Sequence, residues 1–407
     1  MSKSINVPKL RFKEFSGEWV NTKLGNLGNF QGGGTPATSE DKYWIGNIPW
    51  ISSSDIIEGD IKNIKIHRFI NDISIKESAT KLIAKNSILF VSRVGIGKVA
   101  IANTDLCTSQ DFTNLTLIKD DSYFIGYYFL SKNRLLEKYS QGTSIKGFTM
   151  NDLKTLKLNL PSKQEQEKIA LFLASVDTKI EQLTKKEKLL QQYKKGVMQK
   201  IFNQEIRFKA DDGSEFCDWE EKKLGDIFSG IKGQGLSKGD IVENGVNKCI
   251  LYGELYTSYP EIIKEVISKT NSINGVKSLK GDLLIPCSTT TTRIDLADVT
   301  VLYEDNVLLG GDITILRFKK NGNSTFFGYY LTHYKKYDLA KYGQGSTIVH
   351  MYYSHFKTMI IKIPPSIQEQ NKIANFLSSV DSKIEQVNKQ LHSIKEFKKA
   401  LLQQMFV

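Results

Sequence analysis

Two stretches of the chain carry hydrophobic residues at alternating intervals of four and three positions, each over about five heptads. One starts at Ile169 and the other at Ile373. This spacing is typical of a coiled-coil seam, whereas a lone surface helix shows a looser 3.6-residue pattern. The predicted seam consists of Ile169, Leu173, Val176, Ile180, Leu183, Leu190, Ile373, Leu377, Val380, Ile384, Val387, Leu391 and Ile394. We therefore expect two long helices that pair with one another.

The two stretches also belong to an internal repeat. The segment PSKQEQEKIALFLASVDTKIEQ begins at Pro161, and PSIQEQNKIANFLSSVDSKIEQ begins at Pro365; they agree at 17 of 22 positions. Weaker matches precede each copy, with Trp19 corresponding to Trp219, and YSQGTSIKGF to YGQGSTIVHM. Such self-similarity indicates two copies of one structural unit. The predicted boundaries are a variable domain over 1–160, a helix over 161–203, a second variable domain over 204–363 and a second helix over 364–407.

The beginnings of the two helices and their relative direction can also be predicted. Ser162 to Glu165 and Ser366 to Glu369 fit the S-x-x-E capping box, each directly after a proline. A helix of about 40 residues is roughly 60 Å long at about 1.5 Å per residue. In a parallel pair, the domain between the helices would have to carry the chain back over that length, although its radius of gyration is only about 15 Å. We therefore expect an antiparallel pair within one chain, with approximate two-fold symmetry; the alternative is that the helices dimerise two chains.

The sequence between the helices changes to short β-like runs broken by Gly, Asn and Asp, as in KNSILFVSRVGIGKVAI and KGDLLIPCSTTTTRIDLADV. This pattern predicts mixed α/β (α+β) domains of about 140 residues each. Corresponding loops in both domains are rich in Gln, Ser, Thr, Arg and Lys, which read base edges or hold phosphates. The candidate DNA-binding residues in these loops are Gly33, Thr35, Ser92, Arg93, Gly95, Lys98, Gln141, Thr143, Ser144, Lys146, Lys232, Gln234, Ser288, Thr290, Arg293, Gln344, Ser346 and Thr347. The alternative is that these are ordinary polar turns.

Composition fits a DNA-binding protein without establishing one. The chain has 407 residues, of which 40% are hydrophobic and 25% charged, and its net charge of +12 makes a polyanion a plausible partner. It carries neither a signal-peptide core nor an apolar run of about 18 residues, so we expect a cytoplasmic protein. Four cysteines without a CxxC pair suggest reduced thiols and no zinc site, and His350 and His355 are read as surface or packing residues.

Motifs for catalysis are missing from the sequence. GIGK lacks the spacing and the Ser or Thr of a P-loop, and no glycine fingerprint or pocket motif for an extruded base is present. Asp55, Asp60 and Lys62 are close in sequence, which leaves a stand-alone metal-dependent nuclease as one alternative function. An interaction scaffold that does not bind DNA is another. The leading prediction is a protein that reads DNA without modifying it, and with no metal of its own.

Both repeated helical segments, together with GNIPWISSSDI, SILFVSRVGIGKVAI and ILYGELYTSY, resemble the specificity subunit of Type I restriction-modification systems over essentially the whole chain. The resemblance implies two target-recognition domains, each reading one half of a bipartite DNA site, joined by an antiparallel coil. It adds candidate DNA-binding residues within the PWISSSD loop, namely Trp50, Ser52, Ser53 and Asp55, and within its counterpart in the second domain, namely Tyr252, Glu254 and Tyr256.

The resemblance also implies partners. The coil would set the spacer length and dock two modification subunits, which carry S-adenosylmethionine and methylate adenine. Two restriction subunits that use ATP and Mg²⁺ would complete the assembly on double-stranded DNA. This chain itself would bind no cofactor, and because its two domains differ, the two half-sites should differ as well.

Overall fold

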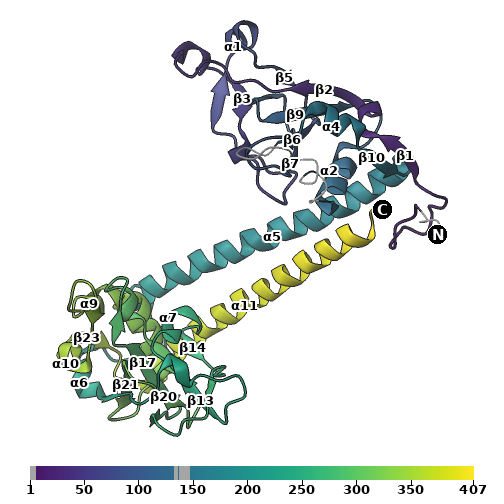
Figure 1. Cartoon of the computed structure of the whole chain (residues 1–407). Coiled ribbons are helices and arrows are strands. Elements are labelled where there is room, and N and C mark those ends of the chain that lie inside the picture. The colour runs from purple at the N-terminus through teal and green to yellow at the C-terminus, as the bar shows by residue number, and fades with distance from the viewer. Residues whose placement is uncertain (1–5, 133–135, 137–146) are drawn as a thin grey trace. The chain divides into compact units, whose positions relative to one another are not determined.

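The computed structural model describes residues 6–132, 136 and 147–407 (Figure 1). The chain divides into two compact units. Unit 1 comprises Met1–Lys185 with Asn388–Val407, and unit 2 comprises Lys186–Val387. Each unit contains one α/β domain and a part of each of two long helices.

The long helices are α5 (Lys163–Phe202), with 40 residues, and α11 (Ile367–Gln404), with 38 residues. Helix α5 begins in unit 1 and ends in unit 2, whereas α11 begins in unit 2 and ends in unit 1. The two run beside one another in Figure 1, and an ion pair joins them within each unit, from Asp177 to Lys398 at 2.6 Å and from Lys194 to Asp381 at 2.8 Å. The predicted antiparallel coiled coil within one chain is confirmed.

The acidic residue in the first turn of each long helix does not complete the predicted capping box. The amide of Glu165 donates to the Ser162 hydroxyl at 3.4 Å, but the Glu165 carboxylate binds Arg11 through Nε and Nη2, both at 2.7 Å. Glu369 binds Arg207 in the same way. Both carboxylates are almost completely buried, so a guanidinium that neutralises them is a better partner than one backbone amide. The reciprocal half of the capping-box prediction is therefore wrong at both helices.

Unit 1 contains two four-stranded sheets and a two-stranded ribbon. One sheet has the order β2 (Gly28–Gly32), β9 (Phe112–Leu117), β6 (Ile88–Val91), β7 (Val99–Ile101), and all its pairs are antiparallel. The other has the order β4 (Arg68–Ile70), β3 (Ile48–Ile51), β8 (Leu106–Thr108), β5 (Leu82–Ile83), in which β3 and β8 are parallel. The ribbon pairs β1 (Val20–Lys23) with β10 (Lys157–Leu160). Beside α5 and α11, the described residues of this unit form the helices α1 (Asp72–Glu77), α2 (Ser122–Ser131) and α4 (Met150–Thr155), with short 3-10 turns at Leu24–Asn26, Asp41–Tyr43 and Ser53–Asp55.

Unit 2 repeats this plan with additional strands. Its first sheet has the order β12 (Phe228–Lys232), β21 (Ile313–Phe318), β17 (Asp282–Pro286), β19 (Thr300–Leu302), β14 (Ile262–Ile263). Its second has the order β15 (Lys269–Thr270), β13 (Asn247–Ile250), β20 (Leu308–Leu309), β16 (Val276–Lys277). Two ribbons pair β11 (Glu220–Lys223) with β23 (Ile360–Ile363), and β18 (Ser288–Thr289) with β22 (Val349–His350).

The helices of unit 2 are short apart from the coil. They are α6 (Leu224–Ile227), α7 (Glu254–Thr257), α8 (Ser324–Tyr329), a π-helical turn at Tyr330–Tyr334, α9 (Lys336–Ala340) and α10 (Tyr353–Phe356), with 3-10 turns at Lys238–Asp240 and Asp295–Ala297. The shared strand order of the two units shows that the repeat extends through the domains, where the sequences have diverged. The predicted mixed α/β class is confirmed.

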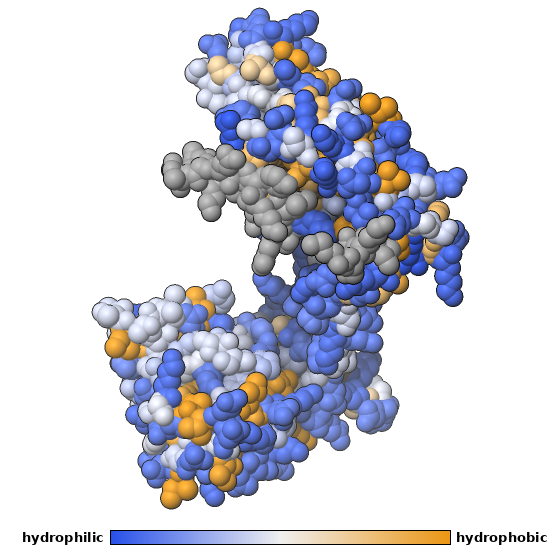
Figure 2. All heavy atoms as spheres, turned by 45° about the vertical axis from the view of Figure 1, so that its right-hand side comes forward, coloured by the Kyte–Doolittle hydropathy of each residue, from blue (hydrophilic) through white to orange (hydrophobic). Residues whose placement is uncertain are grey.

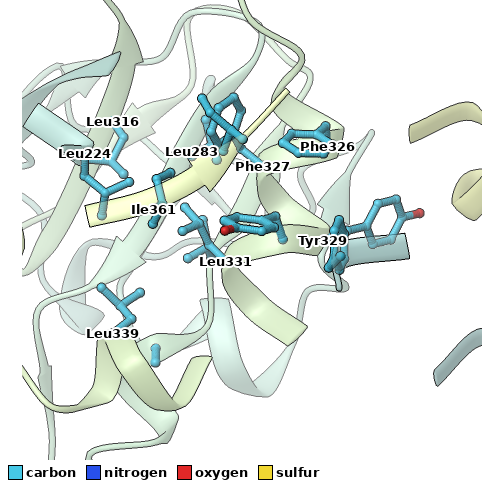
Figure 3. Close-up of a cluster of buried hydrophobic side chains, with 14 of the residues drawn as sticks. Leu224, Leu283, Leu316, Phe326, Phe327, Tyr329, Leu331, Leu339 and Ile361 are labelled. Carbon is cyan, nitrogen blue, oxygen red and sulfur yellow. The ribbon is translucent and has the colours of Figure 1, made fainter. Parts of the chain in front are cut away.

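Each domain shares one hydrophobic core with the ends of the long helices. In unit 1, Ile169 and Leu173 of α5 pack with Trp19, Phe124 and residues near the end of α11. Figure 3 shows the corresponding cluster of unit 2, which includes Leu283, Leu316 and Phe327. The same cluster contains residues from the end of α5 and from the beginning of α11. All the predicted seam residues are buried or half-buried. The seam therefore serves two purposes, because its outer positions anchor a domain while the rest joins the helices.

The surface of the chain is mixed in hydropathy, and its cysteines are reduced. Figure 2 shows hydrophobic residues in small groups among hydrophilic ones on the face it presents. Within the part of the chain that the structure describes, no helix is long and apolar enough to cross a membrane. The four cysteines are free thiols, and burial raises the pKa of Cys107, Cys249 and Cys287 to about 11.

Candidate nucleic-acid interface

Several predicted loops of unit 1 converge at one end of its sheets. The Gly33 amide donates to the Phe112 carbonyl at 3.3 Å, and the Ser92 amide donates to the Asp111 carbonyl at 2.7 Å. The Lys98 ammonium lies 3.5 Å from the Ser53 carbonyl oxygen, and the Thr35 hydroxyl bonds to Gln110. Loops distant in sequence therefore form one polar surface. Arg93 and Gly95 are exposed on it, and Gly33, Thr35 and Lys98 are half-buried.

Other candidates of unit 1 point inward and shape these loops. Trp50 is 4% exposed; its indole N–H donates to the Gly34 carbonyl at 3.0 Å, and the Arg68 guanidinium lies 4.6 Å from its ring. The Asp55 carboxylate accepts from the Ser52 amide at 2.8 Å and pairs with Arg68. Ser53 and Ser92 are also buried. These side chains therefore support the loops, and the exposed side chains of the surface belong to their neighbours.

The three residues of the nuclease alternative do not form one site. The Asp60 carboxylate accepts from the Lys62 amide at 2.8 Å, whereas the Lys62 ammonium donates to the Ala174 carbonyl of α5 at 3.2 Å. Asp55 is held by Ser52 and Arg68. Among the residues that the structure describes, no group of three His, Cys, Asp or Glu side chains could hold a metal ion. Their arrangement gives the nuclease alternative no support.

In unit 2 the corresponding surface gathers around Asp312. The Lys232 ammonium lies 4.0 Å from Asp312 Oδ1 and 5.3 Å from the ring of Tyr352, and the Ser288 hydroxyl donates to Asp312 Oδ2 at 3.0 Å. His350 stacks on Tyr352 with ring centroids 5.8 Å apart. Cations beside stacked rings suit recognition of bases and phosphates.

Sequence reasoning missed Asp312 and Tyr352 and treated His350 as a surface or packing residue. The signal for Asp312 lay in the repeat, because Asp111 and Asp312 each stand directly before a long strand. Both carbonyl groups accept a bond from the end of a neighbouring strand, from the Ser92 amide in unit 1 and the Cys287 amide in unit 2, each at 2.7 Å. The two surfaces thus share a backbone frame and differ in side chains.

The remaining candidates of unit 2 are placed as follows. Exposed candidates are Lys232, Gln234, Tyr252, Thr290, Arg293, Gln344, Ser346 and Thr347. Ser288 is buried, and Glu254 and Tyr256 are half-buried. The Glu254 carboxylate accepts from the Leu251 amide at 2.7 Å and also from the Ser268 hydroxyl, so it supports its loop. Burial raises the pKa of Tyr256, which keeps its hydroxyl protonated. Gln141, Thr143, Ser144 and Lys146 lie outside the described residues.

With this architecture in place, the comparisons identify the family. The model of the Type I restriction modification DNA specificity domain matches the chain twice, over residues 16–191 and 217–396. The chain therefore belongs to the Type I restriction-modification DNA specificity family. A protein of this family is the DNA-recognition component of its system and not a catalytic one.

Relatives and solved structures agree with this assignment. The Type I restriction enzyme MjaIX specificity subunit of Methanocaldococcus jannaschii is 31% identical over 240 residues, which is 55% of each chain. The putative MjaX specificity subunit of the same organism is 27% identical over 98% of this chain and 95% of its own. The crystal structure of the S subunit from M. genitalium shares the fold, with a TM-score of 0.62 at 18% identity, and covers 98% of this chain and 99% of that chain.

Proposed function

We propose that this chain recognises an asymmetric bipartite DNA site, with one half-site read by the domain of each unit. The observation that carries the proposal is the duplication itself. Each unit presents a polar surface at the same place in the same fold, and the side chains on the two surfaces differ. Residues 1–160 and 204–363 are then the target-recognition domains, and the helical segments 161–203 and 364–407 hold them together.

The two surfaces offer different chemistry for DNA. In unit 1, exposed Arg93 beside half-buried Lys98 offers guanidinium and ammonium donors, which favour guanine edges and phosphates. In unit 2, the Lys232 ammonium lies over the Tyr352 ring, which offers a stacking surface. Gln344 forms a β-bridge with His350 and offers a side-chain amide that can read adenine. Unlike donors favour unlike base pairs, so the two half-sites should not be copies of one another.

In the proposed assembly the chain catalyses nothing. Two modification subunits dock on the α5 and α11 helices and bring S-adenosylmethionine to adenine, and two restriction subunits bring ATP and Mg²⁺. The partner is double-stranded DNA in the cytoplasm, and the positive net charge of +12 supplies affinity that does not depend on base sequence. The spacer between the half-sites would follow from the length of the helices.

Single-molecule sequencing of modified bases tests this function. Cells that express the chain with its modification subunits should carry methylated adenines in one bipartite motif, and cells without the chain should lack it. Arg93→Ala should relax or change only the half-site read by unit 1, and the matched variant Arg293→Ala only the other half. A methylated motif that is independent of this chain, or no motif at all in cells making both proteins, contradicts the proposal.

Binding in vitro adds a second test. The purified complex should bind DNA carrying the motif more tightly than DNA lacking it, and affinity for both should fall as salt rises. Failure to bind any DNA, irrespective of salt, would favour the interaction scaffold. Magnesium-dependent cleavage by the chain alone, abolished by Asp60→Ala, would favour the nuclease.

A further inference from the structure

Each long helix carries a lysine at a position where the 4,3 spacing calls for a hydrophobic residue. Lys194 of α5 is buried, and Lys398 of α11 is half-buried. In unit 1, Lys398 of α11 lies 2.6 Å from Asp177 of α5. The second oxygen of Asp177 accepts a hydrogen bond from the Tyr127 hydroxyl of helix α2 at 2.6 Å, and the Lys398 ammonium lies 5.8 Å from the Tyr127 ring. Tyr127 is completely buried. Three side chains thus join the domain to both helices of the coil.

The same arrangement occurs in unit 2 with the helices exchanged. Lys194 of α5 lies 2.8 Å from Asp381 of α11, which accepts from the Tyr329 hydroxyl of α8 at 2.5 Å, and the Lys194 ammonium lies 5.1 Å from the Tyr329 ring. In Figure 3 the Tyr329 hydroxyl points away from the leucine and phenylalanine side chains of the core. The repeat therefore preserves the Tyr–Asp–Lys triad, although the domains around it have diverged.

The protonation states suit this bonding. Burial, followed by the neighbouring carboxylate, raises the pKa of Tyr127 and of Tyr329 far above the ordinary value. Both hydroxyl groups therefore remain protonated and donate to an ionised aspartate, which is the stronger kind of hydrogen bond. The lysine on the partner helix supplies the compensating charge. This matters more for Asp177, whose side chain is 12% exposed, than for Asp381, whose side chain is 36% exposed.

The positions of these charges distinguish between possible pairings of the helices. Lys194 follows Asp177 by 17 residues on α5, and Lys398 follows Asp381 by the same 17 residues on α11. Antiparallel pairing places each aspartate against a lysine. Parallel pairing of the two repeats would place Asp177 against Asp381, and one lysine against the other. A slip by one heptad in the antiparallel pair would leave both aspartates without a counterion, which is costly above all for the buried Asp177.

We propose that the Tyr127–Asp177–Lys398 and Tyr329–Asp381–Lys194 triads fix the register of α5 against α11 and the seating of each domain on that pair. Their six members are positioning residues for bipartite recognition, not base contacts. The effect on DNA rests on the function proposed above, whereas the effect on helix register does not.

The experiment uses the full chain in complex with its modification subunits, once the methylated motif is known. It compares methylation rates on DNA with the native spacer and on DNA with a spacer one base pair longer or shorter. Tyr127→Phe and Tyr329→Phe each remove one hydroxyl and leave the ring beneath the lysine. Each variant should lower the preference for the native spacer about tenfold, because loss of a charge-assisted bond makes other seatings accessible.

Matched controls come from the neighbouring tyrosines. The Tyr330 hydroxyl is also buried, but it donates to the Lys362 carbonyl within the domain and does not reach the coil. Tyr128 is its counterpart in unit 1. Tyr330→Phe and Tyr128→Phe should therefore keep the spacer preference of the wild-type chain, even if their thermal stability falls. Equal loss of preference in the controls and the triad variants would overturn the proposal.

A double substitution separates register from stability. Lys398→Met alone leaves Asp177 without its counterion and should lower the midpoint of thermal unfolding. Asp177→Leu with Lys398→Met should recover part of that loss, because an apolar pair of similar volume replaces an ion pair at little cost, although the Tyr127 hydroxyl loses its acceptor. The double variant should nonetheless remain deficient in spacer preference. A double variant with wild-type preference contradicts the proposal, whereas absence of a specific motif in the wild-type complex contradicts the proposed function.

Discussion

Removal of Arg207 should destabilise unit 2 far more than removal of a nearby exposed lysine. The Glu369 carboxylate at the start of α11 is only 1% exposed. It accepts from Arg207 Nη2 at 3.2 Å through both oxygens and from the Trp219 indole at 3.1 Å. Arg207→Ala leaves this carboxylate buried without a counterion, which costs about 3–5 kcal/mol.

The expected shift in unfolding temperature follows from this energy. For a unit of about 200 residues, one kcal/mol lowers the midpoint by about 2–4 °C. Arg207→Ala should therefore lower the midpoint of thermal unfolding, measured by scanning calorimetry on the full chain, by roughly 6–20 °C.

Lys209→Ala is the matched control. Lys209 pairs with Glu215, and both side chains are 64% exposed, so the loss should be about 0–1 kcal/mol and the shift only a few degrees. Equal shifts for the two variants would refute the view that the buried carboxylate requires the guanidinium.

Three further predictions concern other parts of the chain. A Cβ atom on Gly33 would collide with the Ser109 carbonyl, whereas one on Gly32 would meet no atom within 4 Å. Gly33→Ala should therefore lower the free energy of unfolding by about 1–3 kcal/mol, and Gly32→Ala by less. Urea titration measures both. Leu377 is completely buried in α11, and Leu377→Ala should cost about 2–5 kcal/mol in the same assay. Burial acts to raise the pKa of Glu261, but His333 and Lys194 hold it below its ordinary value of 4.5. The stability of the wild-type chain over Glu261→Gln should therefore persist down to about pH 4.5 and be lost as the pH falls further through the lowered pKa, as urea midpoints between neutral and acidic pH would reveal.

The long helices could be predicted from the sequence because their information is local and repeated. The 4,3 spacing from Ile169 onward and the second copy from Ile373 define both helices, and a chain-length argument gives their direction. What could not be predicted was the role of Lys194 and Lys398, which interrupt the spacing. Their partners lie on other elements, so only the folded chain brings them together.

The same limit applies to the start of the helices and to the candidate interface. A capping box is a pattern of four neighbouring residues, but the Glu165 carboxylate binds Arg11, which stands 154 residues earlier in the chain. Four neighbouring residues do not reveal that partner. Residue type alone marked Trp50 and Asp55 as possible DNA contacts, yet Arg68 and the Gly34 carbonyl hold them inside the loop. Whether a side chain supports its loop or is available to contact DNA depends on its burial. Burial in turn depends on strands that are distant in sequence.

Exchange of one domain tests the central claim most directly. Residues 215 to 360 would be replaced by the corresponding segment of another member of the family, and modified bases would be sequenced in cells that also make the modification subunits. We expect one half of the methylated motif to change while the other half and the spacer stay the same. A change in both halves, or in neither, would contradict the assignment of one half-site to each domain.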